Sequence, residues 1–186
     1  KSNIYMRRQA YGAFEAMHFA AATDGVNLPI ISATRSFSHQ KRIWEGKWQR
    51  TQYMGWSDFK KAKDIMTYSS MPGTSRHHWG TDIDLISLNN DHFANGKGLA
   101  AYEWLKKHAH EYGFGQTYTS KDSGRTGYEE EKWHWSYLVL SKSYLETYLK
   151  IISSEDIKGF SGQGIADSLD VIPHYVNGID SSLRNY

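Results

Sequence analysis

One ten-residue segment decides how this sequence is interpreted: Ser75-Arg76-His77-His78-Trp79-Gly80-Thr81-Asp82-Ile83-Asp84. Two adjacent histidines in it are followed by two carboxylates. Polar and apolar residues alternate over residues 81–88, and this period of two predicts a β-strand. Asp82 and Asp84 fall on the same face of that strand. We therefore expect a cluster of nitrogen and oxygen ligands at the start of a strand.

A second cluster, Glu131-Lys132-Trp133-His134, stands at the entry of another predicted strand, residues 133–140. Zinc accepts imidazole and carboxylate ligands, and a catalytic zinc keeps three protein ligands and one open position. A neighbouring carboxylate that does not bind the metal can serve as base for a water nucleophile. The residues alone leave open which adjacent histidine and which strand carboxylate would bind. We assign no role to the remaining histidines: His18, His39, His92, His108, His110 and His174.

The composition excludes several classes of protein. The 186 residues fit one domain with one core. The 22 Lys and Arg against 20 Asp and Glu leave a formal charge of +2, which indicates no nucleic-acid partner. The absence of cysteine excludes a thiolate nucleophile, a disulfide framework and a cysteine-ligated metal. No apolar run of about 18 residues is present, and because the chain begins at Lys1 we expect that a signal peptide or anchor has been removed.

The rest of the sequence alternates helical patterns with short strands. Apolar residues spaced by three to four predict helices over residues 4–22 and 99–112. Ser38 and Asp58 are expected to cap helices that end near Gln49 and Tyr68. Residues 28–34 have the composition of a strand, and residues 141–152 are expected to form a helix. Residues 115–127 are predicted to be a polar loop, and residues 153–186 a tail with a short helical packing segment.

These motifs resemble those of a known family, the zinc D-alanyl-D-alanine carboxypeptidases and dipeptidases of bacterial cell walls, which includes the VanY and VanX enzymes. The family pattern Ser-x-His-x-x-Gly-x-x-x-Asp appears as Ser75, His77, Gly80 and Asp84, and the later Glu-x-x-His appears as Glu131 and His134. The resemblance implies an α+β fold of the LAS type, an antiparallel sheet flanked by helices. It further implies one peptidase domain over residues 1–186, with the catalytic core at 28–148 and the tail at 153–186 as packing.

The same resemblance implies a metal centre. His77, Asp84 and His134 would hold one zinc ion per chain, and Glu131 would be the catalytic base. Asp82 stands where many relatives carry a small apolar residue, so the resemblance gives it no role.

The resemblance also implies a substrate-binding set. Arg35, in the segment Thr34-Arg35-Ser36-Phe37, would contact the substrate and stabilise the oxyanion. Ser75 would help to hold the terminal carboxylate of the substrate. Gln40, five residues after Arg35, also matches the family pattern and would belong to the same substrate-binding set.

The function that follows from the resemblance is hydrolysis of a peptidoglycan stem peptide or muropeptide, with removal of a C-terminal D-alanine. Two alternatives keep the same zinc site, an endopeptidase of the cell wall and an L,D-carboxypeptidase. A third is a non-catalytic wall-binding module that stacks exposed tryptophans on glycan: Trp44, Trp48, Trp56 or Trp79. We expect a monomer in the cell envelope, periplasmic or extracellular, with no transmembrane segment in this sequence.

Overall fold

The centre of the fold is a four-stranded antiparallel sheet, seen in a computed structural model that describes residues 4–185. Its strands are β1 (Ile30–Ser32), β2 (Asp82–Leu85), β3 (Phe114–Gln116) and β4 (His134–Tyr137), in the order β1-β2-β4-β3. The two strands that follow the sequence motifs, β2 and β4, are therefore neighbours in the middle of the sheet. The predicted α+β class with an antiparallel sheet is confirmed.

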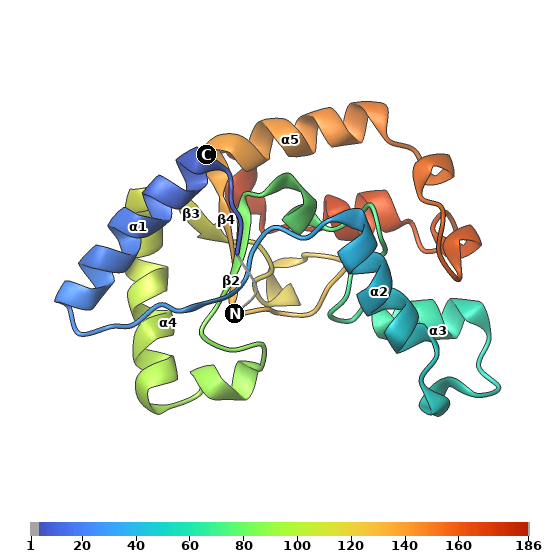
Figure 1. Cartoon of the computed structure of the whole chain (residues 1–186), viewed down its shortest axis with the longest axis horizontal. Coiled ribbons are helices and arrows are strands. Elements are labelled where there is room, and N and C mark those ends of the chain that lie inside the picture. The colour runs from blue at the N-terminus through green and yellow to red at the C-terminus, as the bar shows by residue number, and fades with distance from the viewer. Residues whose placement is uncertain (1–3, 186) are drawn as a thin grey trace.

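Helices cover the sheet from both ends of the molecule. They are α1 (Arg8–Thr23), α2 (Phe37–Trp48), α3 (Asp58–Ile65), α4 (Gly96–His108) and α5 (Leu138–Ile151). Figure 1 shows α1 and α4 together at one end, α2 and α3 at the other, and α5 running along the top. None of the helices among the described residues is long and apolar enough to cross a membrane.

The two faces of the sheet differ because side chains alternate along each strand. Ile83 and Leu85 of β2 and Trp135 of β4 pack in one core cluster with apolar residues of α1 and α4. The residues between them, which include both aspartates of β2, point to the opposite face. The alternation therefore separates a dry core from a polar face where the candidate site lies.

Several element boundaries differ from the sequence predictions. The first helix begins at Arg8 instead of residue 4, because the chain before it pairs through the Arg7 amide with the Gly80 carbonyl. Ser36, not Ser38, caps α2 by accepting a hydrogen bond from the amide of His39. In the same way Ser57, and not Asp58, caps α3.

Two larger differences concern strands. β3 lies at the start of the segment predicted to be a polar loop, and Gly115 in it pairs with Ser136 of β4. The strand predicted over residues 133–140 ends at Tyr137, where α5 begins without a loop. The last amides of the strand bond to its two neighbours, that of Tyr137 to the carbonyl of Thr81 before β2 and that of Leu138 to the carbonyl of Gly113 before β3.

The tail after residue 152 supplies part of the core. Phe160 and Leu169 lie in a cluster with Trp44 of α2, and Val176 lies in another with Tyr128. The helical packing segment predicted in the tail is a short π-helical turn, Val171–Val176. Trp44 is fully buried, so it is not available to stack on a glycan.

Candidate metal centre

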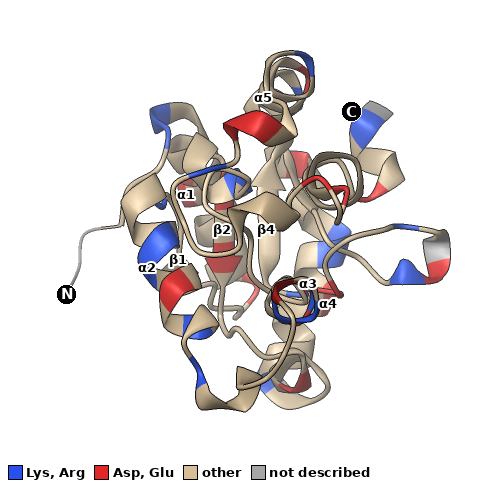
Figure 2. Cartoon of the chain, turned by 90° about the vertical axis from the view of Figure 1, so that its right-hand side faces the viewer, with Lys and Arg blue, Asp and Glu red and all other residues tan. Residues whose placement is uncertain are grey.

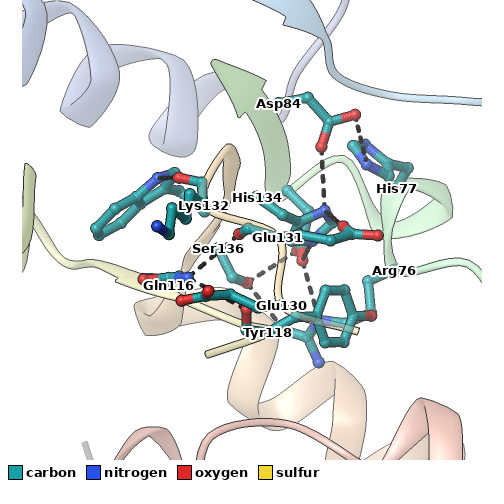
Figure 3. Close-up of polar contacts among 12 residues, drawn as sticks. Arg76, His77, Asp84, Gln116, Tyr118, Glu130, Glu131, Lys132, His134 and Ser136 are labelled. Carbon is teal, nitrogen blue, oxygen red and sulfur yellow. Dashed lines mark hydrogen bonds and ion pairs between the residues drawn. The ribbon is translucent and has the colours of Figure 1, made fainter. Parts of the chain in front are cut away.

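The register of the sheet brings the two sequence clusters together. Asp84 of β2 pairs directly with His134 of β4, and Asp82 pairs with Ser136. Paired residues of neighbouring antiparallel strands point to the same face, with their Cβ atoms about 4.5–5.5 Å apart. His77 reaches the same point from a short 3₁₀ helix, Arg76–Trp79. Each of His77, Asp84 and His134 offers one ligand atom, and these atoms lie within 4.8 Å of one another (Figure 3).

The two adjacent histidines face in different directions. Nδ1 of His77 lies 2.7 Å from the carbonyl oxygen of Ala33, which directs Nε2 toward Asp84. That Nε2 is buried and has no hydrogen-bond partner among the described residues, although Oδ2 of Asp84 is 3.2 Å away. Both nitrogens of His78 are in use, one near the carbonyl of Arg35 and the other accepting from the amide of Gly73. His77 is therefore the histidine that is free to bind an ion.

Charge at the cluster is set by burial and close contacts. Burial and the neighbouring charge of Arg35 lower the pKa of His77 to about 4, so this imidazole is neutral. Burial alone would lower the pKa of His134, but hydrogen bonds to Asp82 and Asp84 outweigh it and raise that pKa to about 9. Burial disfavours the charged form of Asp84, yet the two histidines hold its pKa below the usual range. His134 would give up one proton on binding a cation, and two neutral imidazoles and an ionised carboxylate, all buried, then form a donor set that suits zinc.

Glu131 stands beside the cluster without belonging to it. The amide of His134 bonds to the carbonyl of Glu131, and this turn leaves the Glu131 carboxylate 3.5 Å from Nδ1 of His134. Its own backbone is held by the carbonyl of Tyr118. Burial, partly offset by His134 and reinforced by Asp84, raises the pKa of Glu131 to about 8. A carboxyl group with a pKa near neutrality is well matched to exchange a proton with a substrate.

The residues predicted to bind substrate fall into two groups. Arg35 and Ser75 line a small cavity of about 30 Å³ together with His77, Asp84 and Glu131. Arg35 donates from Nη2 to Oδ2 of Asp84 at 3.1 Å.

Gln40 does not line this cavity. It is fully buried, accepts a hydrogen bond from Nη1 of Arg35 and donates one to the carbonyl of Ser70. Gln40 therefore holds the guanidinium of Arg35 in place.

Sequence reasoning missed several residues at the site. Tyr118 and Tyr128 line the cavity, and the Tyr118 ring lies 4.8 Å from that of His134. Tyr118 comes from the segment predicted to be a polar loop, and Tyr128 directly follows that segment, so neither lies in a periodic pattern that would mark it as buried. Arg76 and Ser136 contact Asp82 behind the cluster, and the position of Ser136 two residues after His134 was a signal that could have identified it.

Charge elsewhere on the molecule is mixed. Figure 2 shows Lys and Arg distributed over the periphery together with Asp and Glu, whereas the acidic residues of β2 lie at the centre of the view. No large basic face appears in this view, which agrees with the formal charge of +2.

Comparisons with known proteins match this geometry. Residues 3–140 match the VanY family, described as D-alanyl-D-alanine carboxypeptidase. A Bacillus subtilis (strain 168) protein named "Putative carboxypeptidase YodJ" is 31% identical over 136 residues, 72% of this chain and 46% of that protein. The D-alanyl-D-alanine carboxypeptidase of Enterococcus faecalis (strain ATCC 700802 / V583) is 28% identical over 119 residues, 64% of this chain and 43% of that protein. This chain thus spans less than half the length of either curated relative.

A solved structure gives the same fold. A crystal structure of a variant of the vancomycin resistance D,D-pentapeptidase VanY, in complex with Zn(II), aligns with a TM-score of 0.60 at 24% identity. The alignment covers 77% of this chain and 78% of that one, and at this identity it bears on the fold alone. From the sequence match and the shared fold together, this chain belongs to the VanY D-alanyl-D-alanine carboxypeptidase family.

Proposed function

We propose that this chain is a zinc-dependent peptidase that removes the C-terminal D-alanine from peptidoglycan stem peptides. The observation that supports it most is the buried group of His77, Asp84 and His134 with the Glu131 carboxylate next to it. The Zn(II) in the related VanY structure and the family description support the choice of metal and of substrate. When bound, zinc would polarise a peptide carbonyl and make a water molecule acidic enough to attack it near neutral pH.

The residues of the chain would then act in sequence. Glu131 accepts the proton of the attacking water and passes it to the leaving amine. Arg35 stays charged and offers several directed donors, which suits it to the developing oxyanion or to a carboxylate. Ser75, on the wall of the same cavity, would help to hold the terminal carboxylate, while Gln40 acts through Arg35 as a positioning residue.

The polar lining of the cavity favours an exopeptidase. Arg35 and Ser75 offer donors that could hold the terminal carboxylate of a substrate beside His77 and Asp84. We further propose that residues 1–186 act as one domain and as a monomer in the cell envelope. The contacts of the tail with Trp44 and Tyr128 support a single domain.

The test is product analysis on matched peptides. We expect release of one D-alanine from a stem peptide that ends in D-Ala-D-Ala, and a kcat/KM lower by about one to two decades for the C-terminally amidated peptide. An amide cannot accept the charge-assisted hydrogen bonds that a carboxylate accepts. Equal hydrolysis of the two peptides, or fragments from an internal cut, would contradict the exopeptidase and favour the endopeptidase.

Arg35→Ala separates the two roles of this residue. If Arg35 holds the carboxylate, the preference for the free peptide shrinks in the variant. If it stabilises only the oxyanion, both peptides slow by the same factor.

A further inference from the structure

Behind the proposed metal ligands lies a second polar cluster that the proposed function does not use. Asp82 is fully buried, and its Oδ2 accepts from Nε of Arg76 at 2.9 Å. Its Oδ1 accepts from the hydroxyls of Thr81 at 2.7 Å and Ser136 at 2.8 Å. Arg76 also donates from Nη2 to Ser136 at 2.9 Å. Figure 3 shows Arg76 and Ser136 of this cluster, which lie below Asp84 and His77 in the view.

The cluster contacts the metal centre through the ring of His134. Nε2 of His134 lies 2.9 Å from Oδ2 of Asp82, while Nδ1 of the same ring lies 3.1 Å from Oδ1 of Asp84. An imidazole that binds a metal through one nitrogen carries its proton on the other. Asp82 is the acceptor for that proton, and it fixes which nitrogen of His134 faces His77 and Asp84.

Asp82 has no spare capacity to bind the metal itself. An ionised carboxylate offers about four acceptor positions. In Asp82 they are taken by Arg76, His134, Thr81 and Ser136. The Asp84 carboxylate, by contrast, faces both histidines and Arg35 across the cavity.

A gain in stability does not by itself explain why the Arg76–Asp82 ion pair is buried. A buried ion pair is often matched or exceeded in stability by well-packed apolar residues of similar volume. Arg76 and Asp82 have side chains only 1% and 0% exposed, so both charges lose almost all their hydration. A role in orienting a metal ligand would explain why the desolvation of both charges is tolerated. Groups that orient metal ligands typically change metal affinity by about 10–100-fold.

We propose that Asp82 is a positioning residue for the metal centre. It holds Nε2–H of His134 so that Nδ1 faces the ion, and Arg76, Thr81 and Ser136 hold Asp82. This inference rests on the proposed zinc site and adds to it a carboxylate that orients one of the histidine ligands.

The experiment measures zinc affinity by competition with a chelator. Asp82→Asn keeps an oxygen acceptor for His134 but loses the charge, and we expect affinity to fall by about tenfold. The double variant Asp82→Leu, Arg76→Met removes both buried charges together, which protects the fold, and leaves His134 without its acceptor. We expect its zinc affinity to fall by about 100-fold. Asp64→Asn is the matched control, since Asp64 accepts from Tyr53 outside the site and its loss should leave affinity unchanged.

Cobalt(II) substitution adds a spectroscopic readout. The absorption bands of the cobalt-loaded protein should keep their pattern in Asp82→Asn, because the three ligands are the same, and should change in Asp84→Ala. A double variant that folds and binds zinc within twofold of the unaltered protein would overturn the role of Asp82. So would loss of zinc in Asp82→Asn as complete as in Asp84→Ala, since Asp82 would then be a ligand. If the unaltered protein binds no zinc, the proposed function falls together with this inference.

Discussion

Among the single residues, Glu131 is proposed to act in the reaction but not to hold the metal. Glu131→Gln keeps the size of the side chain and removes its ability to accept a proton. We expect zinc content to stay the same and turnover to fall by about 10²-fold or more. Glu130→Gln, one residue earlier, is the control and should keep near-normal turnover. Loss of zinc in Glu131→Gln would show that Glu131 is a ligand instead.

The identities of these residues were predictable from sequence only with help from the family pattern. His77 and His78 are the same chemically, and the difference lies in backbone partners, Ala33 for one and Arg35 with Gly73 for the other. Ala33 and Arg35 lie 44 and 43 residues before their histidines, so no local pattern contains these two contacts. The family spacing selected His77 and Asp84, the pair that the structure groups with His134.

At the level of the helices, the N-terminal cap of α2 can be tested by substituting its two candidate serines. Ser36 accepts from the amide of His39 at 3.1 Å, whereas Ser38, the residue predicted from sequence, is exposed within the first turn. We expect Ser36→Ala to lower the free energy of unfolding by about 1 kcal/mol and Ser38→Ala to change it by less than about 0.5 kcal/mol. Chemical denaturation measures both. A larger loss of stability in Ser38→Ala than in Ser36→Ala would support Ser38 as the cap, as the sequence predicted.

Strands were predictable where alternation is strong and hidden where it is not. Residues 81–88 alternate clearly and contain β2, but the pairing of Asp84 with His134 could not be read from either strand alone. β3 has only three residues with a glycine in the middle. A Cβ at Gly115 would lie 2.5 Å from Cδ2 of Leu183, so a larger residue there would require the Leu183 side chain to move.

At the scale of the whole molecule, stability without metal should depend on pH. The pKa of Glu131 rises from 4.5 to about 8 and that of His134 from 6.5 to about 9, so both groups hold protons that the unfolded chain releases. Between pH 6.5 and 9 the unfolded state therefore binds fewer protons, and stability falls as pH rises. We expect the Tm of the metal-free protein to be several degrees lower at pH 8.5 than at pH 6.5. A Tm that rises over this range would contradict the charge assignment, and Glu131→Gln should show a smaller fall.

The tail is the part of the molecule about which the sequence said least. Residues 153–186 lie beyond the family match, yet Phe160 and Val176 are buried against Trp44 and Tyr128. Short irregular turns leave no clear hydrophobic period, so their burial follows from the shape of the surface they cover. The tail thus supports Tyr128, which lines the cavity of the metal centre.

We propose that two clusters distant in sequence form one zinc site. An anomalous-scattering map, recorded at the zinc edge from crystals of the zinc-loaded protein, would locate the ion and its ligands. We predict one strong peak at about 2.0–2.2 Å from Nε2 of His77, a carboxylate oxygen of Asp84 and Nδ1 of His134. A peak bound by Asp82 in place of Asp84, or no peak at this position in crystals grown with excess zinc, would contradict the account.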